Sequence, residues 1–347
     1  MLLRFKAHFA RIGAMIMSLR ITTATVEHFR LMPSFIDGRG LTGFRFMTIL
    51  FLFGAGASYG NPDCIPHPPP LGGQLLDALR VRGGVAASID DELIKVFRNN
   101  FEEGMAEFFR TRNVEVTSFQ REMAEYFCQF EPGPNNFYRR IIDILGGTEK
   151  KAVFATTNYD LLIELSINRS GFMVSYTNLP VPERNVSVLK IHGSCNFLPA
   201  LQSRQIQGIG FEVPESVSIL EAPIRVATPH EVREFCQRED SIAPAIALYA
   251  KGKSVLHCPS FVKHQQEFFK IEIYRASKIF IIGLRVNHQD HHIWVPLSNA
   301  KGKLFYIGRE PNEFRQWLRS VNKKNGYILA DTFEESLPLI KRRIYGH

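Results

Sequence analysis

The chain has 347 residues, of which 45% are hydrophobic and 22% are charged, a balance that is typical of a folded globular protein and excludes a disordered or fibrous chain. The net charge is +8 at pH 7, but residues 1–46 alone hold seven Lys and Arg against two acidic residues. Most of the excess charge therefore belongs to one segment, and we expect no nucleic-acid partner. No apolar run approaches the roughly 20 residues that cross a bilayer, so we also expect no membrane span.

Residues 1–46 form a basic N-terminal extension ahead of the expected fold. Their best apolar stretch, residues 12–19, is flanked by arginines and lacks a small-residue cleavage site, which disfavours a secretory signal. An Arg-rich, acid-poor composition is also typical of an organellar presequence. A second interpretation stays open, in which translation starts at Met47, directly before the first expected strand.

The chain contains five cysteines and no CxxC pair. Neighbouring cysteine pairs therefore cannot build a four-thiolate zinc site. An odd number of cysteines without a secretory signal fits a reducing compartment better than a disulfide framework. We expect a cytoplasmic protein.

In the first half of the chain, one buried strand precedes a helical region. Residues 48–53 are wholly apolar, as expected of a strand covered on both faces. A Gly-Ala-Gly-Ala-Ser segment and a Pro-rich loop over residues 62–70 follow. Helical periodicity then predicts helices that begin near Leu71, over 89–103, over 116–130 and over 134–145. Residues 85–148 are expected to form a helical insertion.

In the second half, strands and helices alternate again. Apolar periodicity predicts strands over 152–156, 186–191, 278–282 and 303–307, and helices after residue 160, over 260–276, from about residue 290 and around 314–321. Between residues 199 and 253 the periodicity weakens, so no architecture is predicted there. Buried strands that alternate with amphipathic helices indicate an α/β protein with a doubly wound, mainly parallel, Rossmann-like sheet.

Polar clusters follow four of these strands, at residues 54–58, 156–160, 192–194 and 283–292. Ligands of doubly wound folds bind beyond the carboxyl ends of the strands, which makes these clusters the candidate site. Glycines of the first cluster could let a pyrophosphate approach the backbone. However, the third glycine of the common GxGxxG pattern is missing, and the Pro-rich loop is expected to delay the next helix. A tight strand-to-loop turn is the alternative.

The second and third clusters contain Asn158, Asp160 and His192. Asn158 and Asp160 precede a helix and could cap it, or they could hold the vicinal hydroxyls of a sugar. A histidine with an intrinsic pKa of about 6.5 suits a general base at neutral pH. His192 could equally serve only as a hydrogen-bonding residue at the rim of the sheet.

Together and in this order, the segments GAGAS, TTNYD and KIHGS resemble the sirtuin family, whose signatures read GAGxS, TQNxD and HG. The Pro-rich stretch that ends at Gly72 is similar to the flexible cofactor loop of the zinc-free, prokaryotic branch. Residues 281–284 resemble the later family strand that approaches the nucleotide. The resemblance covers roughly residues 49–309.

This resemblance implies an NAD site. It implies pyrophosphate contacts from Gly54, Ala55, Gly56 and Ser58. Asn158 and Asp160 would contact the nicotinamide ribose or its pocket, with Asn158 orienting the ribose and a nucleophilic water, and His192 would be the catalytic base. Gly283 would lie along the adenosine half of NAD. Gly308 and Arg309 would lie near the adenine ribose, although Gly308 stands where the family often has an asparagine.

Two departures from the family pattern narrow the expected activity. The chain lacks the CxxC pairs of the zinc module and the Asp-Phe-Arg triplet of the cofactor loop. The resemblance is therefore to the family's NAD hydrolases, which release nicotinamide and ADP-ribose and several of which act in bacterial phage defence. It also implies activation by a protein partner or by assembly of copies of the chain.

Two other functions stay open. The first is NAD-dependent protein deacylation or ADP-ribosyl transfer, which a hydrophobic peptide groove built from residues 200–250 would support. The second is a non-catalytic module that senses NAD or ADP-ribose, or docks a partner. Retention of both Asn158 and His192 argues against the second.

The loop after the strand at 278–282 contains His288, Asp290, His291 and His292. Adjacent histidines point to different sides of a helix or strand, and no further ligand is evident nearby in the sequence. We therefore expect no metal site. Asp290 is expected to cap the helix that follows, or the loop could cover the adenine.

Overall fold

A computed structural model describes residues 48–148, 151–177, 185–200, 220–238, 242–247 and 255–346. Contacts divide the chain into the units Met1–Arg45 and Phe46–His347, and every described residue belongs to the second. The expected basic extension over residues 1–46 therefore lies outside the described residues, as does about half of the stretch 199–253.

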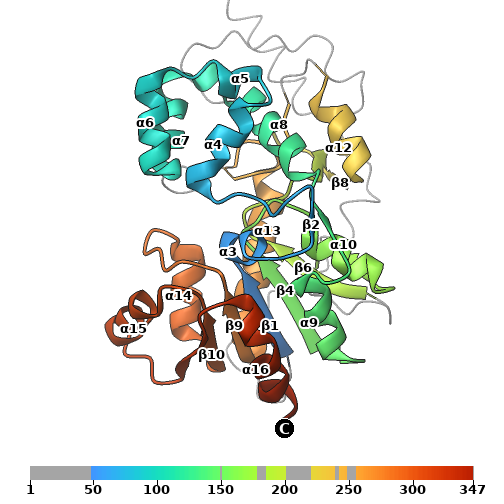
Figure 1. Ribbon diagram of the computed structural model, residues 1–347, viewed down its shortest axis with the longest axis vertical. Helices are drawn as coiled ribbons and strands as arrows, with labels where there is room; N and C mark the ends of the chain where they lie inside the picture. The colour runs from blue at the N-terminus through green and yellow to red at the C-terminus, as the bar shows by residue number, and fades with distance from the viewer. Residues whose placement is uncertain are drawn as a thin grey trace, which may run out of the picture. The chain divides into compact units, whose positions relative to one another are not determined.

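Seven parallel strands form the main sheet, in the order β11-β10-β9-β1-β4-β6-β5 (Figure 1). The strands are β1 (Thr48–Phe53), β4 (Ala152–Thr156), β5 (Met173–Ser175), β6 (Asn185–Lys190), β9 (Ala276–Ile282), β10 (Lys303–Ile307) and β11 (Gly326–Ala330). From β1 the chain first builds β4, β5 and β6 on one side and later β9, β10 and β11 on the other. The predicted doubly wound fold is confirmed, and its topological switch point lies between β1 and β9.

The central strand β1 is apolar because both of its faces are buried. Phe51 and Phe53 belong to one hydrophobic core, and Leu50 and Leu52 belong to the other. The Phe51 ring stacks between two rings at the same level of the neighbouring strands, 5.4 Å from that of Phe154 and 5.1 Å from that of Phe280. Successive side chains of β1 therefore point to opposite faces of the sheet, and each face packs against its own layer of helices.

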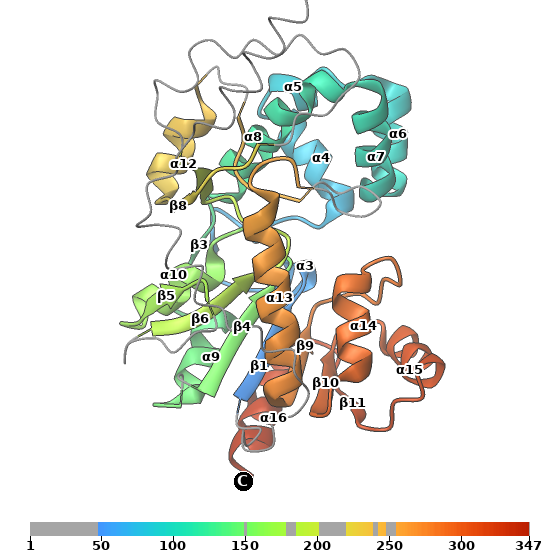
Figure 2. The ribbon, with the colours of Figure 1, turned by 180° about the vertical axis from the view of Figure 1, so that it is seen from behind.

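Helices α13 (Pro259–Arg275), α14 (His291–Asn299) and α15 (Pro311–Ser320) cover the face reached by Leu50 and Leu52, where Figure 2 shows α13 running over the sheet. Helices α9 (Phe137–Leu145), α10 (Leu162–Arg169) and α16 (Phe333–Tyr345) cover the opposite face. Among the helices that the structure describes, none combines the length and the apolar character that a membrane crossing requires.

A separate group of helices lies beyond the carboxyl edge of the sheet (Figure 1). It comprises α4 (Gly72–Arg80), α5 (Gly84–Ala87), α6 (Asp91–Asn99), α7 (Phe101–Thr111), the 3-10 turn η1 (Asn113–Glu115), α8 (Val116–Phe127) and α12 (Pro229–Cys236), which packs on α8. The single helix predicted over 89–103 is wrong. Asn100 is extended there, with φ −152° and ψ 114°, and its side chain caps α7 by accepting hydrogen bonds from Glu102 N and Glu103 N.

Helix α3 (Ala55–Tyr59) starts directly after β1. The expected delay of the next helix until after the Pro-rich loop is therefore wrong, because the Gly-Ala-Gly-Ala-Ser segment is itself helical. Two short antiparallel pairs complete the described structure. They are β2 (Cys64–Ile65) with β3 (Glu131–Pro132) and β7 (Phe197–Pro199) with β8 (Ile224–Val226).

Candidate active site

The carboxyl ends of β1 and β9 meet at the switch point of the sheet. Gly54 N donates to Ile282 O and Gly56 N donates to Gly283 O, each at 2.9 Å. A Cβ at Gly54 would lie 2.5 Å from Gly283 O, and a Cβ at Gly283, where φ is +61°, would lie 2.2 Å from Ala57 N. Close packing of the two backbone segments therefore requires glycine at these positions. Packing alone thus explains the glycine pattern, without any bound ligand. The predicted contact of these glycines with a pyrophosphate stays a prediction.

Asn158 connects the first two sequence clusters. Its Nδ2 donates to Gly54 O at 3.1 Å and to Ser58 Oγ at 2.9 Å. The Ser58 hydroxyl donates in turn to Asp160 Oδ2 at 3.0 Å and lies 2.9 Å from the Tyr138 hydroxyl. The GAGAS and TTNYD segments, about a hundred residues apart in sequence, thus form one hydrogen-bonded unit at the sheet edge.

Asp160 holds the start of helix α10. Its Oδ1 accepts from Leu162 N, at the first residue of the helix, at 3.1 Å, although the N-cap position itself is Leu161, whereas the Asn158 amide turns toward β1 instead. Lys190 Nζ donates to the backbone oxygen of Asp160 at 2.6 Å and pairs with Glu164 Oε1 at 3.1 Å. Burial raises the pKa of the Asp160 carboxyl, and the Lys190 ammonium opposes that shift.

His192 lies at the end of the strand next to β4. Thr156 pairs with Lys190, and Ile191 N donates to Thr156 O at 3.1 Å, so Asn158 and His192 follow their paired positions by the same two residues. Gly193 has φ +80°, and a Cβ there would lie 1.9 Å from Ala245 O. The turn after β6 therefore requires a glycine next to the histidine.

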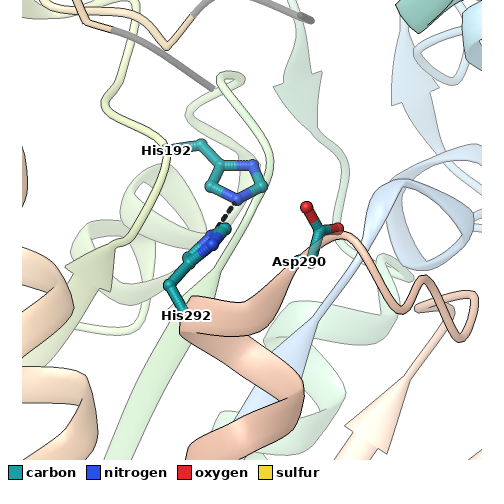
Figure 3. Close-up of side chains that lie close together, drawn as sticks. All are labelled: His192, Asp290 and His292. Carbon is teal, nitrogen blue, oxygen red and sulfur yellow. Dashed lines mark hydrogen bonds between the residues drawn. The ribbon is translucent and has the colours of Figure 1, made fainter. Parts of the chain in front are cut away.

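The side chains of Asn158 and His192 have different contacts. Asn158 bonds Ser58 on the side of α9, whereas His192 Nε2 lies 2.7 Å from Nε2 of His292 on α14 (Figure 3). His192 is only 3% exposed. The structure therefore brings the predicted pair to neighbouring positions at one edge, and a ribose shared between them stays a prediction.

The loop before α14 differs from the expectation. The Asp290 side chain makes no capping hydrogen bond to α14, so its predicted capping role is wrong. Its carboxylate instead lies close to His192 and His292, with one ligand atom of each residue within 4.8 Å of the other two. The expectation that no further ligand lies near this loop is also wrong, because His192 comes from the other half of the sheet.

The remaining predicted positions lie one strand further out. Gly308 N donates to Ala330 O at 3.2 Å, and a Cβ at Gly308 would lie 2.9 Å from the Tyr306 hydroxyl. Arg309 is exposed beyond the carboxyl end of β10. Both residues share the edge that carries the other clusters, and their predicted place near an adenine ribose stays a prediction.

Several residues that build the site carry no sequence signal of their own. Tyr138 and Lys190 read as an ordinary helix residue and an ordinary strand residue, although both are buried against the polar cluster. His292 stands out in the sequence only as one of several histidines close together. Its contact with His192 depends on the fold of the loop over the sheet edge.

The sequence matches no protein-family model and no curated protein. Solved structures similar to the chain include a Sir2 homologue mutant in complex with ADP-ribose, at a TM-score of 0.44 and 15% identity, covering 86% of this chain and 93% of that one. Another is a Sir2 homologue in complex with NAD, at a TM-score of 0.44 and 16% identity, covering 86% of this chain and 90% of that one.

Proposed function

We propose that this chain is a sirtuin-like, NAD-consuming enzyme, and specifically an NAD⁺ hydrolase that cleaves the nicotinamide–ribose bond to give nicotinamide and ADP-ribose. The observation that carries the proposal is the pair of hydrogen bonds from Asn158 to Gly54 and Ser58. These bonds join two of the three motif segments, and His192 of the third follows the adjacent strand. The similar solved structures add no weight, because their TM-scores and identities are low.

The position of the cluster supports a dinucleotide. Ligands of doubly wound sheets bind where the strand order reverses, and here that point lies between β1 and β9. At this point Ala55 is exposed and Gly56 is half-buried, so phosphate oxygens can approach the backbone without a large side chain between. Gly283 extends the same surface from β9.

The reaction mainly requires that the protein position the ribose and the attacking water. Nicotinamide leaves as a neutral molecule from a cationic pyridinium, and positive charge develops on the ribose as in glycoside hydrolysis. Asn158, held by two hydrogen bonds, would orient the ribose and the attacking water. His192 would accept a proton from a ribose hydroxyl or from that water. Its Nε2 contacts His292 in the structure, so a ribose must either replace that contact or use Nδ1.

Nicotinamide release from NAD, measured by chromatography with the full-length protein, tests the proposal. A well-placed base contributes about 10²- to 10⁴-fold, so His192→Ala should lose at least about 100-fold, and Asn158→Ala should also lose most turnover. His230→Ala, whose side chain is 73% exposed on α12, is the control and should retain it. Nicotinamide release that survives both site substitutions would reject the site assignment. If the wild type neither releases nicotinamide nor binds NAD, the enzymatic proposal is rejected.

Two further results would favour the alternatives. Release that requires an acylated peptide would favour a deacylase, and NAD binding without release would favour a sensing module or an enzyme that awaits a partner.

The proposal includes the role in antiphage defence and the activation that the resemblance implies. A fall in cellular NAD on infection, present with the wild type and lost with His192→Ala, tests that role.

A further inference from the structure

We infer that His192, His292 and Asp290 form a binding site for a divalent transition-metal ion of the zinc class. Three potential ligand atoms, one from each side chain, lie within 4.8 Å of one another. Figure 3 shows the two imidazoles facing each other with the carboxylate beside them. His192 and Asp290 are 3% and 6% exposed. These two side chains are therefore largely removed from water, where charged groups are paired or bind metal ions, whereas His292 is half-buried.

The chemistry of the three side chains selects the class of ion. Two imidazole nitrogens and one carboxylate oxygen are ligands that zinc and similar divalent ions accept in proteins. Three protein ligands also leave a fourth position for water or a ligand, as in zinc sites that are not purely structural. Calcium and magnesium are disfavoured because they prefer oxygen ligands throughout.

The distances fit after a small side-chain movement. With metal–ligand bonds of about 2.05 Å, tetrahedral geometry places ligand atoms about 3.4 Å apart. The two Nε2 atoms lie 2.7 Å apart and the whole set lies within 4.8 Å. An ion would therefore separate the imidazoles by about 0.7 Å and draw the carboxylate closer, which side-chain torsions can supply.

The backbone explains how Asp290 and His292 come to face the same point. Two helical residues separated by two positions do not share a face. Asp290, however, lies just before α14 with φ −80° and ψ 59°, outside the helical range. Its carboxylate is therefore directed independently of the helix, while His292 occupies the first turn of α14.

The three ligands belong to well-packed parts of the fold. Ala247 N donates to His192 O at 2.8 Å and fixes the turn after β6. Ile293 and Trp294, which follow His292, are buried under the sheet face. His292 also borders a hollow of about 530 Å³ between α13 and α14, lined by Lys270, Tyr274 and Asn299 among others.

A metal at this position would have a consequence for the base. A neutral imidazole that binds a metal through Nε2 carries its proton on Nδ1, so neither ring nitrogen has a lone pair left to accept a proton. Metal binding through His192 would therefore inhibit NAD cleavage. This consequence rests on the proposed function, whereas the metal site itself does not.

The test is a titration of the full-length, untagged, chelator-treated protein with Co²⁺ and Zn²⁺ in the absence of NAD. Co²⁺ is followed by its visible absorption, which is strong for four-coordinate sites, and Zn²⁺ by calorimetry. We expect one ion per chain. His292→Ala and Asp290→Asn should each weaken binding by at least about 10- to 100-fold, the loss seen even for residues that merely support a ligand.

His291→Ala is the matched control, because His291 is the exposed neighbour of His292 on the same helix, and it should bind as the wild type does. Circular dichroism of each metal-free variant verifies its fold. Absence of saturable binding, equal binding by wild type and His292→Ala, or a thiolate charge-transfer band would overturn the inference. Nicotinamide release in excess chelator tests the proposed function separately, so the two can fail independently.

Discussion

Lys190 provides a quantitative test of how the candidate site is held together. Its ammonium lies 3.1 Å from Glu164 Oε1 and 2.6 Å from the backbone oxygen of Asp160, and its side chain is 1% exposed. Burial raises the pKa of both carboxyls, and the charge of Lys190 opposes that shift in each. Replacing Lys190 with methionine removes that charge and leaves two buried carboxyls without it.

Removing one partner of a buried ion pair costs about 3–5 kcal/mol. At about 1.4 kcal/mol for each factor of ten, the ratio of folded to unfolded Lys190→Met protein should fall by roughly 10²- to 10⁴-fold. Urea unfolding followed by circular dichroism measures this free energy. Lys270→Met is the control, because its pair with Glu267, at 2.8 Å, is about half exposed and should cost about 0–1 kcal/mol.

The pH dependence has a defined sign. A carboxyl whose pKa is raised in the folded state binds its proton more tightly there, so stability falls as pH rises from the unfolded pKa through the folded one. Loss of Lys190 raises the folded pKa values of Asp160 and Glu164 further. The stability difference between wild type and Lys190→Met should therefore be small below the ordinary carboxyl pKa values and should grow as pH rises toward neutrality.

A second substitution separates charge from packing. Adding Glu164→Gln to Lys190→Met removes one of the uncompensated charges, and we expect it to recover at least about 1 kcal/mol at neutral pH. Two results would refute the reasoning. One is a cost for Lys190→Met no larger than that for Lys270→Met, and the other is no recovery in the double variant.

Two further predictions concern packing. Gly283→Ala places a Cβ 2.2 Å from Ala57 N at a φ of +61°, so calorimetry should show a loss of about 1–3 kcal/mol. Gly73→Ala, in α4 with open space around it, should be neutral or stabilising, and equal effects would contradict the steric account. Burial raises the pKa of Cys64 and Cys236 to about 12, so these thiols should react with iodoacetamide at pH 8 only after unfolding, whereas rapid labelling would contradict their burial.

Much of the sheet could be predicted because its central strands are apolar on both faces. The predicted ranges 48–53, 152–156 and 303–307 coincide with β1, β4 and β10. No strand is predicted where the edge strand β11 lies, although its residues GYILA are apolar and mostly half-buried. Helix α16 was missed as well, and its internal Pro338 obscures a helical pattern.

The features of the site that the sequence could not predict have a different physical cause. Placing Asn158 and His192 at one edge of the sheet required only the parallel topology that alternating strands and helices indicate. That β4 and β6 are neighbours depends on the strand order, which local periodicity does not specify. The approach of His292 to His192 required the path of the 283–290 loop over the sheet edge, which no local pattern specifies. For the same reason the sequence favours a capping role for Asp290, because His192, one of the two histidines near its carboxylate, lies far away in sequence.

A crystal structure of the full-length protein in complex with ADP-ribose tests the central claim most directly. The account predicts the diphosphate beside Ala55 and Gly56, with the terminal ribose within hydrogen-bond reach of both Asn158 and His192. A nucleotide bound elsewhere on the chain, or a ribose that reaches neither side chain, would contradict it.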